Sequence, residues 1–358
     1  MRKILLFLVF SIQSCLLFGQ MVLTKRADDF TPIECFLKLS DSLEAGITPS
    51  SALWSEYFSI PVVQLFSQAP GFDSSKFASD MKLIFSRKVS GIDTTGLNEQ
   101  QHLMLAYKNN KGLIRMTIDQ MKTQKIEDSI KSLLYPYLPK SMRVDSLLPK
   151  QLYLFLDEGN GGFPGYVFNS MLQTALVNTL KAGIISAHES YHSLVGGVSM
   201  SKLENAGPIP FSDGEKGLIS FLEMIAEEGI ADLIDKPILG LPGSPLYTEV
   251  KALRQNEDKF SAIYLGKIDS LLVETSRTGS IPSFDFREFT KNGGHIPGRY
   301  MAERIKQASL LAPCIQAAGD PITFFEQYQA AIKKIGKGPA LSATAMAYLK
   351  SLKSRYRK

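Results

Sequence analysis

The sequence is poor in cysteine, which limits both disulfides and cysteine-based metal sites. Its 358 residues include only three cysteines, at positions 15, 35 and 314, and they form no cluster. Cys35 and Cys314 could pair in an oxidising compartment, but sequence spacing does not bring two cysteines within bonding distance. Any metal site must therefore use carboxylates and histidines, of which there are only four.

A strong excess of charge is also lacking. The formal net charge is +5, and it falls to +3 when Arg2 and Lys3 are left out. This surplus is too small to predict a nucleic-acid partner, and the basic C-terminal stretch KSLKSRYRK is typical of a solvated helix end. The composition, 44% hydrophobic and 21% charged residues, is that of a globular protein.

Long apolar runs are confined to the N-terminus. Arg2 and Lys3 precede an apolar run that ends at Phe18 and is short for a membrane span. This pattern predicts a signal peptide over residues 1–19, cleaved after Gly19. The alternative is a bacterial lipid anchor at Cys15, but the apolar residues after it favour cleavage. We therefore expect an exported protein (periplasmic, cell-surface or extracellular) with no membrane span after the signal peptide.

The remaining chain has no internal repeat and no low-complexity linker. We expect an N-terminal helical region over residues 20–150 and a second region over 151–358, packed together as one unit. Apolar spacing predicts helices through most of residues 30–140 and a strand over 151–157. The glycine-rich stretch EGNGGFPGYVF then predicts a tight turn and a second, edge strand.

The region after this sheet is predicted to be helical. One largely buried helix is expected over residues 170–195, ended by Gly196–Gly197. The next is expected to follow Ser212-Asp213, with Glu215 in its first turn, and to end at Asp235, before Pro237. Further helices are expected over residues 250–272, 297–312, 320–334 and 340–352. The predicted fold class is mainly α (α+β), with a small sheet before the helix that carries the motif described next.

The stretch SAHESYHS carries the strongest chemical signal in the chain. On a helix, His188 and His192 lie on one face, one turn apart, so two imidazoles can bind one zinc ion. Glu189 points about 100° away and can reach a metal-bound water without being a ligand. This is the H-E-x-x-H signature, in which zinc acidifies the water and the glutamate accepts its proton. The alternative is two histidines satisfied by carbonyl groups in a buried helix.

A catalytic zinc needs a third protein ligand and an open position for water. In the helix FLEMIAEEGIADLID, Glu228 and Asp232 fall on the apolar stripe, where carboxylates are costly unless a cation or donors meet them. We therefore predict Glu228 as the third ligand of one zinc per chain. Asp232 is predicted to accept the second ring N–H of a ligating histidine. Glu227 falls in a polar sector with Glu223.

These two helices together resemble those of the gluzincin metallopeptidases. Thermolysin and its relatives carry an Asn-Glu-x-x-Ser-Asp stretch on the second helix. The matching stretch here is Glu227-Glu228-Gly-Ile-Ala231-Asp232, in which Glu228 comes 36 residues after His192. The resemblance implies that Glu228 is the ligand and Asp232 the outer carboxylate. Glu227 replaces the Asn and Ala231 the Ser, so the resemblance leaves their supporting roles open.

The resemblance also extends beyond the motif. The N-terminal signal, the helical N-terminal half and the Tyr-Leu-Pro segment are similar to a poorly characterised bacterial family of zinc-dependent peptidases. The chain does not resemble the metzincins, because it has no third histidine six residues after His192.

Peptide hydrolysis also needs a group that stabilises the oxyanion. Gluzincins often use a His or Tyr from a later segment, and GGHIPGRYMAERI offers His295 first and Tyr300 next. A surface histidine followed by a buried tyrosine is the alternative for this segment. The predicted edge strand can pair with an extended substrate, although a glycine-rich hairpin needs no function.

The function predicted from the sequence is a secreted zinc-dependent peptidase acting on a peptide or protein substrate. His188, His192 and Glu228 would bind the zinc, and Glu189 would be the general base. One alternative is a non-catalytic exported protein whose zinc site is closed by a fourth ligand such as Asp213. Another is a zinc hydrolase of non-peptide substrates, because a fold and a metal do not select the substrate.

Overall fold

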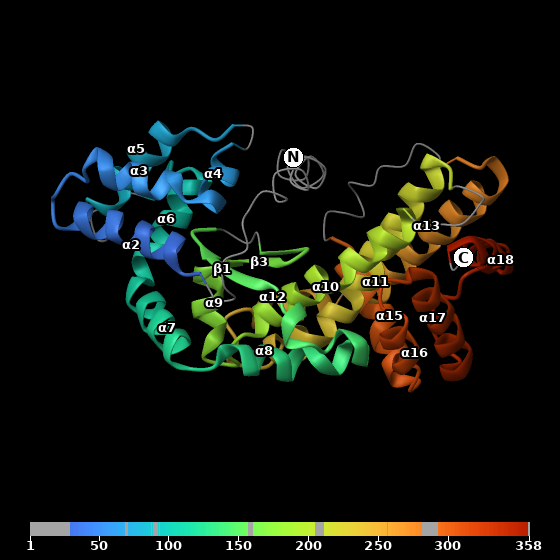
Figure 1. The fold of residues 1–358 in the computed structure, drawn as a ribbon. Coiled ribbons are helices and arrows are strands. Elements are labelled where there is room, and N and C mark those ends of the chain that lie inside the picture. The colour runs from blue at the N-terminus through green and yellow to red at the C-terminus, as the bar shows by residue number, and fades with distance from the viewer. Residues whose placement is uncertain are drawn as a thin grey trace. The chain divides into compact units, whose positions relative to one another are not determined.

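The structure is a computed structural model. It describes residues 29–356 except 69–70, 87, 89–91, 93, 157–159, 205–210, 256 and 281–292. The predicted signal peptide over residues 1–19 and the alternative lipid anchor at Cys15 lie outside the described residues, so both stay predictions. The described chain is mainly helical with one small sheet, which confirms the predicted fold class (Figure 1).

The chain divides into two compact units that interleave along the sequence. The first comprises the residues up to Ile126 together with Lys150–Asn160 and Phe168–Thr179. The second comprises Glu127–Pro149, Gly161–Val167 and the residues from Leu180 onward.

The first unit packs short helices around an aromatic core. Phe36 lies at its centre, with ring centroids 5.7 Å from Tyr107 and 4.3 Å from Phe155. The Tyr107 hydroxyl donates to the carbonyl groups of Leu154 and Leu156. The helices of this unit are α2 (Thr31–Glu44), α3 (Ser51–Ser59), α4 (Pro61–Ser67), α5 (Ser74–Phe85), α6 (Glu99–Asn109), α7 (Lys111–Thr123) and α9 (Met171–Asn178).

The second unit holds the longer helices. Its elements are α8 (Ile126–Leu134), three short 3₁₀ turns (Tyr135–Tyr137, Lys140–Met142 and Asp145–Leu147), α10 (Ile184–Glu204), α11 (Asp213–Leu239), α12 (Tyr247–Gln255), α13 (Glu257–Thr278), α15 (His295–Gln307), α16 (Leu311–Gln316), α17 (Pro321–Ile335) and α18 (Ala343–Tyr356). Helix α11 packs against α10 and α15, and α15 packs in turn against α13 and α17.

The sheet has three strands, β1 (Lys150–Leu154), β2 (Gly161–Phe163) and β3 (Tyr166–Ser170), in the order β1-β3-β2. The glycine-rich stretch therefore contains the predicted tight turn and edge strand, β2, but it also contributes β3, a strand that was not predicted. Gly165 makes the turn possible because its φ of +83° is a conformation that favours glycine.

The helix predicted over residues 170–195 is two helices, α9 and α10. Gly183, with a φ of +74°, lies between them. At its other end α10 continues through Gly196–Gly197 to Glu204, so the predicted end is wrong. Gly196 packs toward α11, where an added Cβ would lie 3.7 Å from Glu227 Oε2. Packing between the two helices thus outweighs the weak helix propensity of glycine.

Helix α11 begins after the N-cap Ser212, as predicted, but it passes Pro237 and ends at Leu239. A proline inside a helix cannot donate to the carbonyl group four residues earlier, here that of Leu233. The Tyr137 hydroxyl donates to this carbonyl at 2.9 Å and so replaces the missing hydrogen bond. The last turn of α11, which carries Asp235 and Lys236, is therefore kept helical.

The later helices were predicted in the right regions but with different ends. The helix predicted over residues 250–272 is the pair α12 and α13. The helix predicted over residues 297–312 begins earlier, at His295, after the N-cap Gly294 with a φ of +87°. His295 is thus the first residue of α15 rather than part of a preceding loop.

Helices α11 and α15 approach each other through two glycines. A Cβ on Gly298 would lie 2.2 Å from the Ile225 carbonyl oxygen and 2.8 Å from the Gly229 nitrogen. Only glycine allows backbones this close, and the close approach carries the first turn of α15 to the middle of α11.

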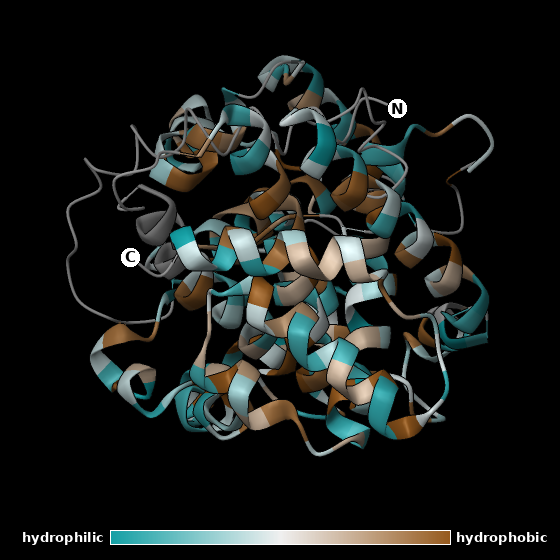
Figure 2. Ribbon diagram, turned by 90° about the vertical axis from the view of Figure 1, so that its right-hand side faces the viewer, coloured by the Kyte–Doolittle hydropathy of each residue, from teal (hydrophilic) through white to brown (hydrophobic). Residues whose placement is uncertain are grey.

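The described helices mix hydrophilic and hydrophobic residues along their length (Figure 2). None of them is long and apolar enough to cross a membrane. Cys35 and Cys314 are both free and buried.

Candidate metal centre

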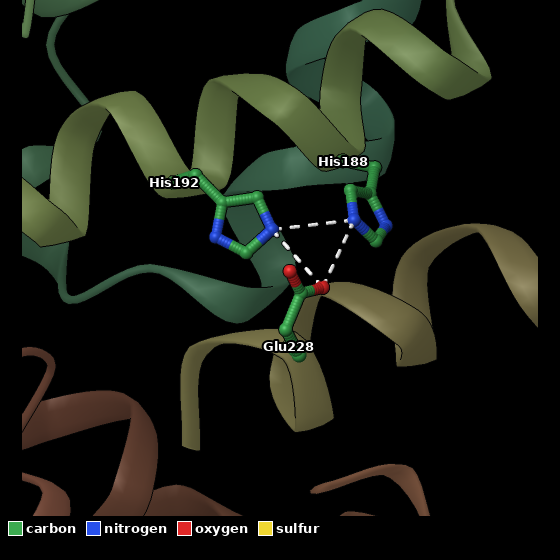
Figure 3. Close-up of side chains that lie close together, drawn as sticks. All are labelled: His188, His192 and Glu228. Atoms are coloured by element: carbon green, nitrogen blue, oxygen red, sulfur yellow. Dashed lines mark hydrogen bonds and ion pairs between the residues drawn. The ribbon is translucent and has the colours of Figure 1, made fainter. Parts of the chain in front are cut away.

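Helices α10 and α11 of the second unit bring three donor atoms together (Figure 3). His188 and His192 point from one face of α10, with their Nε2 atoms 3.2 Å apart. From α11, Glu228 Oε2 lies 3.5 Å from His188 Nε2 and 3.4 Å from His192 Nε2. The three residues predicted as ligands therefore form one compact triangle.

The spacing of this triangle fits a zinc ion. Bonds of about 2.0–2.1 Å in a tetrahedral zinc site place the ligand atoms about 3.3–3.4 Å from one another. The distances in the triangle are 3.2–3.5 Å. Glu228 Oε2 is buried and accepts no well-aligned hydrogen bond within the described chain, although imidazole nitrogens surround it. A buried carboxylate oxygen in this position is well suited to bind a metal ion.

The second nitrogen of each histidine faces a carboxylate of α11. His188 Nδ1 lies 3.2 Å from Asp235 Oδ1, and His192 Nδ1 lies 3.5 Å from Glu227 Oε2. Such partners fix the ring orientation and the tautomer, so that Nε2 is left for the metal. Glu227 thus lies behind His192, one of the predicted ligands, whereas the sequence had left the role of Glu227 open.

Asp232 was predicted to face the second nitrogen of a ligating histidine, but Asp235 takes that place at His188 and Glu227 at His192. The sequence does carry a signal for Asp235, because it follows Glu228 by seven residues and so lies two turns further on the same face. The choice between Asp232 and Asp235 depends on how α10 crosses α11, which local spacing does not specify.

Asp232 instead faces the third histidine. His295 Nδ1 lies 3.1 Å from Asp232 Oδ1 and 3.1 Å from Glu228 Oε2. The first turn of α15 therefore brings His295 to the edge of the triangle, whereas its side chain stays about one-third exposed.

A lysine that was not predicted completes this network. Lys236 Nζ lies 2.8 Å from Asp235 Oδ2 and 3.3 Å from Asp232 Oδ1. The signal in the sequence was its position four residues after Asp232 on the same helix.

Tyr300 and Arg299 do not join the triangle. The Tyr300 ring lies 4.9 Å below the Arg304 guanidinium and 6.3 Å from the Tyr328 ring, on the side of α15 that packs against α17. Arg299 pairs with Glu257, 2.8 Å away. Of the candidates in this segment, the structure brings only His295 to the triangle.

The charges of the site favour a bound cation. Burial opposes ionisation of Glu228, but His295 and His192 outweigh it and hold the pKa of Glu228 well below its usual range. Burial also opposes a charged His188, but Asp235 and Glu228 outweigh it and raise the pKa of His188 to about 10. The carboxylates thus stabilise positive charge at the imidazoles, as a proton or as a metal ion.

Glu189 is next to His188 on α10 and its side chain is half-buried. Burial raises the pKa of Glu189, although His188 and His192 partly oppose the shift. A raised carboxylate pKa makes the group a better proton acceptor, as a general base requires.

Strand β2 lies directly on α10 at this point. A Cβ on Gly162 would come within 2.0 Å of the Glu189 carbonyl oxygen and 2.7 Å of the Ser193 nitrogen. The Ser193 hydroxyl donates to the Phe163 carbonyl. Only glycine permits this approach, which places the edge strand beside His192.

Among the described residues, His188, His192 and Glu228 form one group of three possible ligands, and two other groups of three share His188 or Glu228 with Asp232, Asp235 and His295. Asp213, the predicted candidate for a closed site, lies on the same continuous helix as Glu228. Fifteen residues of helix separate them by about 22 Å. Asp213 therefore does not reach the site.

No curated protein and no solved structure matches the chain. A family model described as "Putative zinc dependent peptidase (DUF5700)" matches residues 54–337, which include the whole triangle, and the chain belongs to this family.

Proposed function

We propose that the protein is a zinc metallopeptidase of the gluzincin type, with one zinc ion bound by His188, His192 and Glu228. The observation that carries this proposal is the triangle of donor atoms at 3.2–3.5 Å, with Glu189 beside it on α10. The family description supports zinc-dependent peptidase chemistry. The distance of Asp213 from the triangle favours an open catalytic site over a closed structural one.

In this proposal Glu189 moves the proton. Zinc, when bound, polarises the scissile carbonyl group and acidifies water. The Glu189 carboxylate accepts a proton from the attacking water as the water oxygen bonds to the carbonyl carbon. It then delivers that proton to the amine nitrogen as the C–N bond breaks. The raised pKa of Glu189 supports both halves of this role.

His295 is the proposed oxyanion group. Burial opposes its charged form, but Glu228 and Asp232 outweigh burial and raise the pKa of His295. In the protonated imidazole both nitrogens donate, so Nδ1 can face the carboxylates while Nε2 donates to the developing oxyanion.

Strand β2 is the proposed guide for the substrate. The sheet order makes β2 an edge strand, and Gly162 packs it onto α10 beside His192. An extended peptide can add to such an edge by backbone hydrogen bonds. This supports a peptide or protein substrate over a small non-peptide one.

Cleavage of a quenched fluorescent peptide library by zinc-loaded protein tests the proposal. Wild type should cleave part of the library. Glu189→Gln should keep about one zinc per chain and lose about 10²–10⁴-fold in turnover, the usual contribution of a general base. Full activity of Glu189→Gln would remove Glu189 from its role. A fully zinc-loaded wild type that cleaves nothing would instead point to a structural zinc site.

A further inference from the structure

We propose that Lys236 is a positioning residue that holds the metal ligand His188 and the oxyanion candidate His295 in place together, by bridging Asp235 and Asp232. The inference rests on the proposed function, which it deepens by naming a residue outside the ligand set on which the site depends.

The contacts form a continuous chain across two helices. Asp235 Oδ1 lies 3.2 Å from His188 Nδ1, and its other oxygen lies 2.8 Å from Lys236 Nζ. Asp232 Oδ1 lies 3.3 Å from Lys236 Nζ and 3.1 Å from His295 Nδ1. One ammonium group therefore connects the two carboxylates that face the two histidines.

Burial makes this bridge necessary. The side chains of Asp232 and Asp235 are 1% and 2% exposed, and their oxygens lie within 4.8 Å of each other and of His188. Two buried carboxylates this close repel each other and are costly without a compensating cation. Within the described chain, Lys236 is the only lysine or arginine that pairs with either.

The position of Lys236 depends on the last turn of α11. Lys236 lies four residues after Asp232 and directly before Pro237, in the last turn of α11. That turn stays helical because Tyr137 donates to the Leu233 carbonyl that the proline leaves without its usual donor. Removing the Lys236 charge should let the carboxylates move apart, and the orientation of His188 and His295 should be lost with them.

The test is zinc affinity, measured by competition with a chromophoric chelator, for wild type and Lys236→Met. Methionine keeps most of the length and removes the charge. Because loss of an outer partner of a metal ligand usually costs about 10–100-fold in metal affinity, we expect a loss of that size, with kcat lowered more than KM. Lys216→Met is the matched control, because Lys216 lies on the same helix with its side chain 52% exposed. It should bind zinc like wild type.

A double-mutant cycle separates positioning from a general structural role. If Lys236 acts through Asp235, the double mutant Lys236→Met/Asp235→Asn should lose much less zinc affinity than the product of the losses in the two single mutants. Multiplicative effects, or wild-type zinc affinity in folded Lys236→Met, would overturn the proposal. If Lys236→Met does not fold, Lys236→Arg keeps the charge and should bind zinc within about tenfold of wild type. A larger loss in folded Lys236→Arg would also overturn it.

These readouts distinguish this inference from the proposed function. Zinc binding that depends on Lys236, in a protein that cleaves no peptide, would keep the positioning role and reject the peptidase. Peptide cleavage with zinc affinity that does not depend on Lys236 would keep the peptidase and reject the positioning role.

Discussion

At the scale of single residues, each ionisable group of the site is defined by what it faces. His295 faces Glu228 and Asp232, whereas Tyr300 is buried on the far side of the same helix, next to Arg304. The two residues were candidates for one role in the sequence, and only one of them lies near the triangle of His188, His192 and Glu228.

This contrast gives a prediction for two substitutions. His295→Gln should lower kcat by about 10²–10³, the usual cost of losing one oxyanion donor, and should keep the zinc. Tyr300→Phe removes a hydroxyl that lies away from the ligands, so kcat should stay within about threefold of wild type. Steady-state kinetics with zinc content measured on the same samples checks both. A larger loss for Tyr300→Phe than for His295→Gln would refute the assignment.

The two free cysteines give a prediction on pH. Burial raises the pKa of the Cys314 thiol to about 12 and also raises that of Cys35. The thiolate is the reactive form, so at pH 8 the native Cys314 should react with a chromogenic disulfide reagent about 10³-fold more slowly than in the unfolded chain. Between the unfolded pKa near 9 and the folded pKa near 12, the unfolded chain loses the proton first, so the free energy of unfolding should fall as pH rises. Equal thiol reaction rates in native and unfolded protein would contradict this burial.

At the scale of elements, the site depends on how closely helices approach. The contact of Gly229 with Gly298 sets the distance between α11 and α15, and thereby the position of His295. The contact of Gly162 with α10 does the same for strand β2.

Gly298→Ala should therefore destabilise the protein. The added Cβ meets backbone atoms of α11, and such overpacking costs about 1–3 kcal/mol. The control is Gly266→Ala in α13, where an added Cβ has no neighbour within 4 Å, so it should stabilise the helix by about 0.5–1 kcal/mol. Denaturant unfolding measures both, and kcat should fall only for Gly298→Ala. Equal stability of the two variants would contradict the close approach.

Some features of these helices could be predicted from the sequence and others could not. The motif helix, the N-cap Ser212 and the placement of Glu228 on the next helix follow from local spacing. The continuation of α11 past Pro237 does not, because the hydroxyl that permits it belongs to Tyr137, 96 residues away. The position of Asp235 behind His188 was not predicted for a similar reason. It depends on how α10 crosses α11, which is set by tertiary packing and not by local sequence.

At the scale of the whole molecule, two compact units interleave along the chain, and the family match over residues 54–337 includes parts of both. All residues of the metal centre lie in the second unit. The proposed activity therefore requires that this unit binds zinc where α10 meets α11.

The zinc content of purified wild type and Glu228→Ala, measured side by side, tests this most directly. We expect about one zinc per chain in wild type and a loss of at least about tenfold in occupancy for Glu228→Ala at limiting zinc, because a three-ligand site loses one ligand. Glu274→Ala, at a partly exposed glutamate paired with Arg277 on α13, is the control and should keep the zinc. Equal zinc content in wild type and Glu228→Ala, or no zinc in either, would contradict the account.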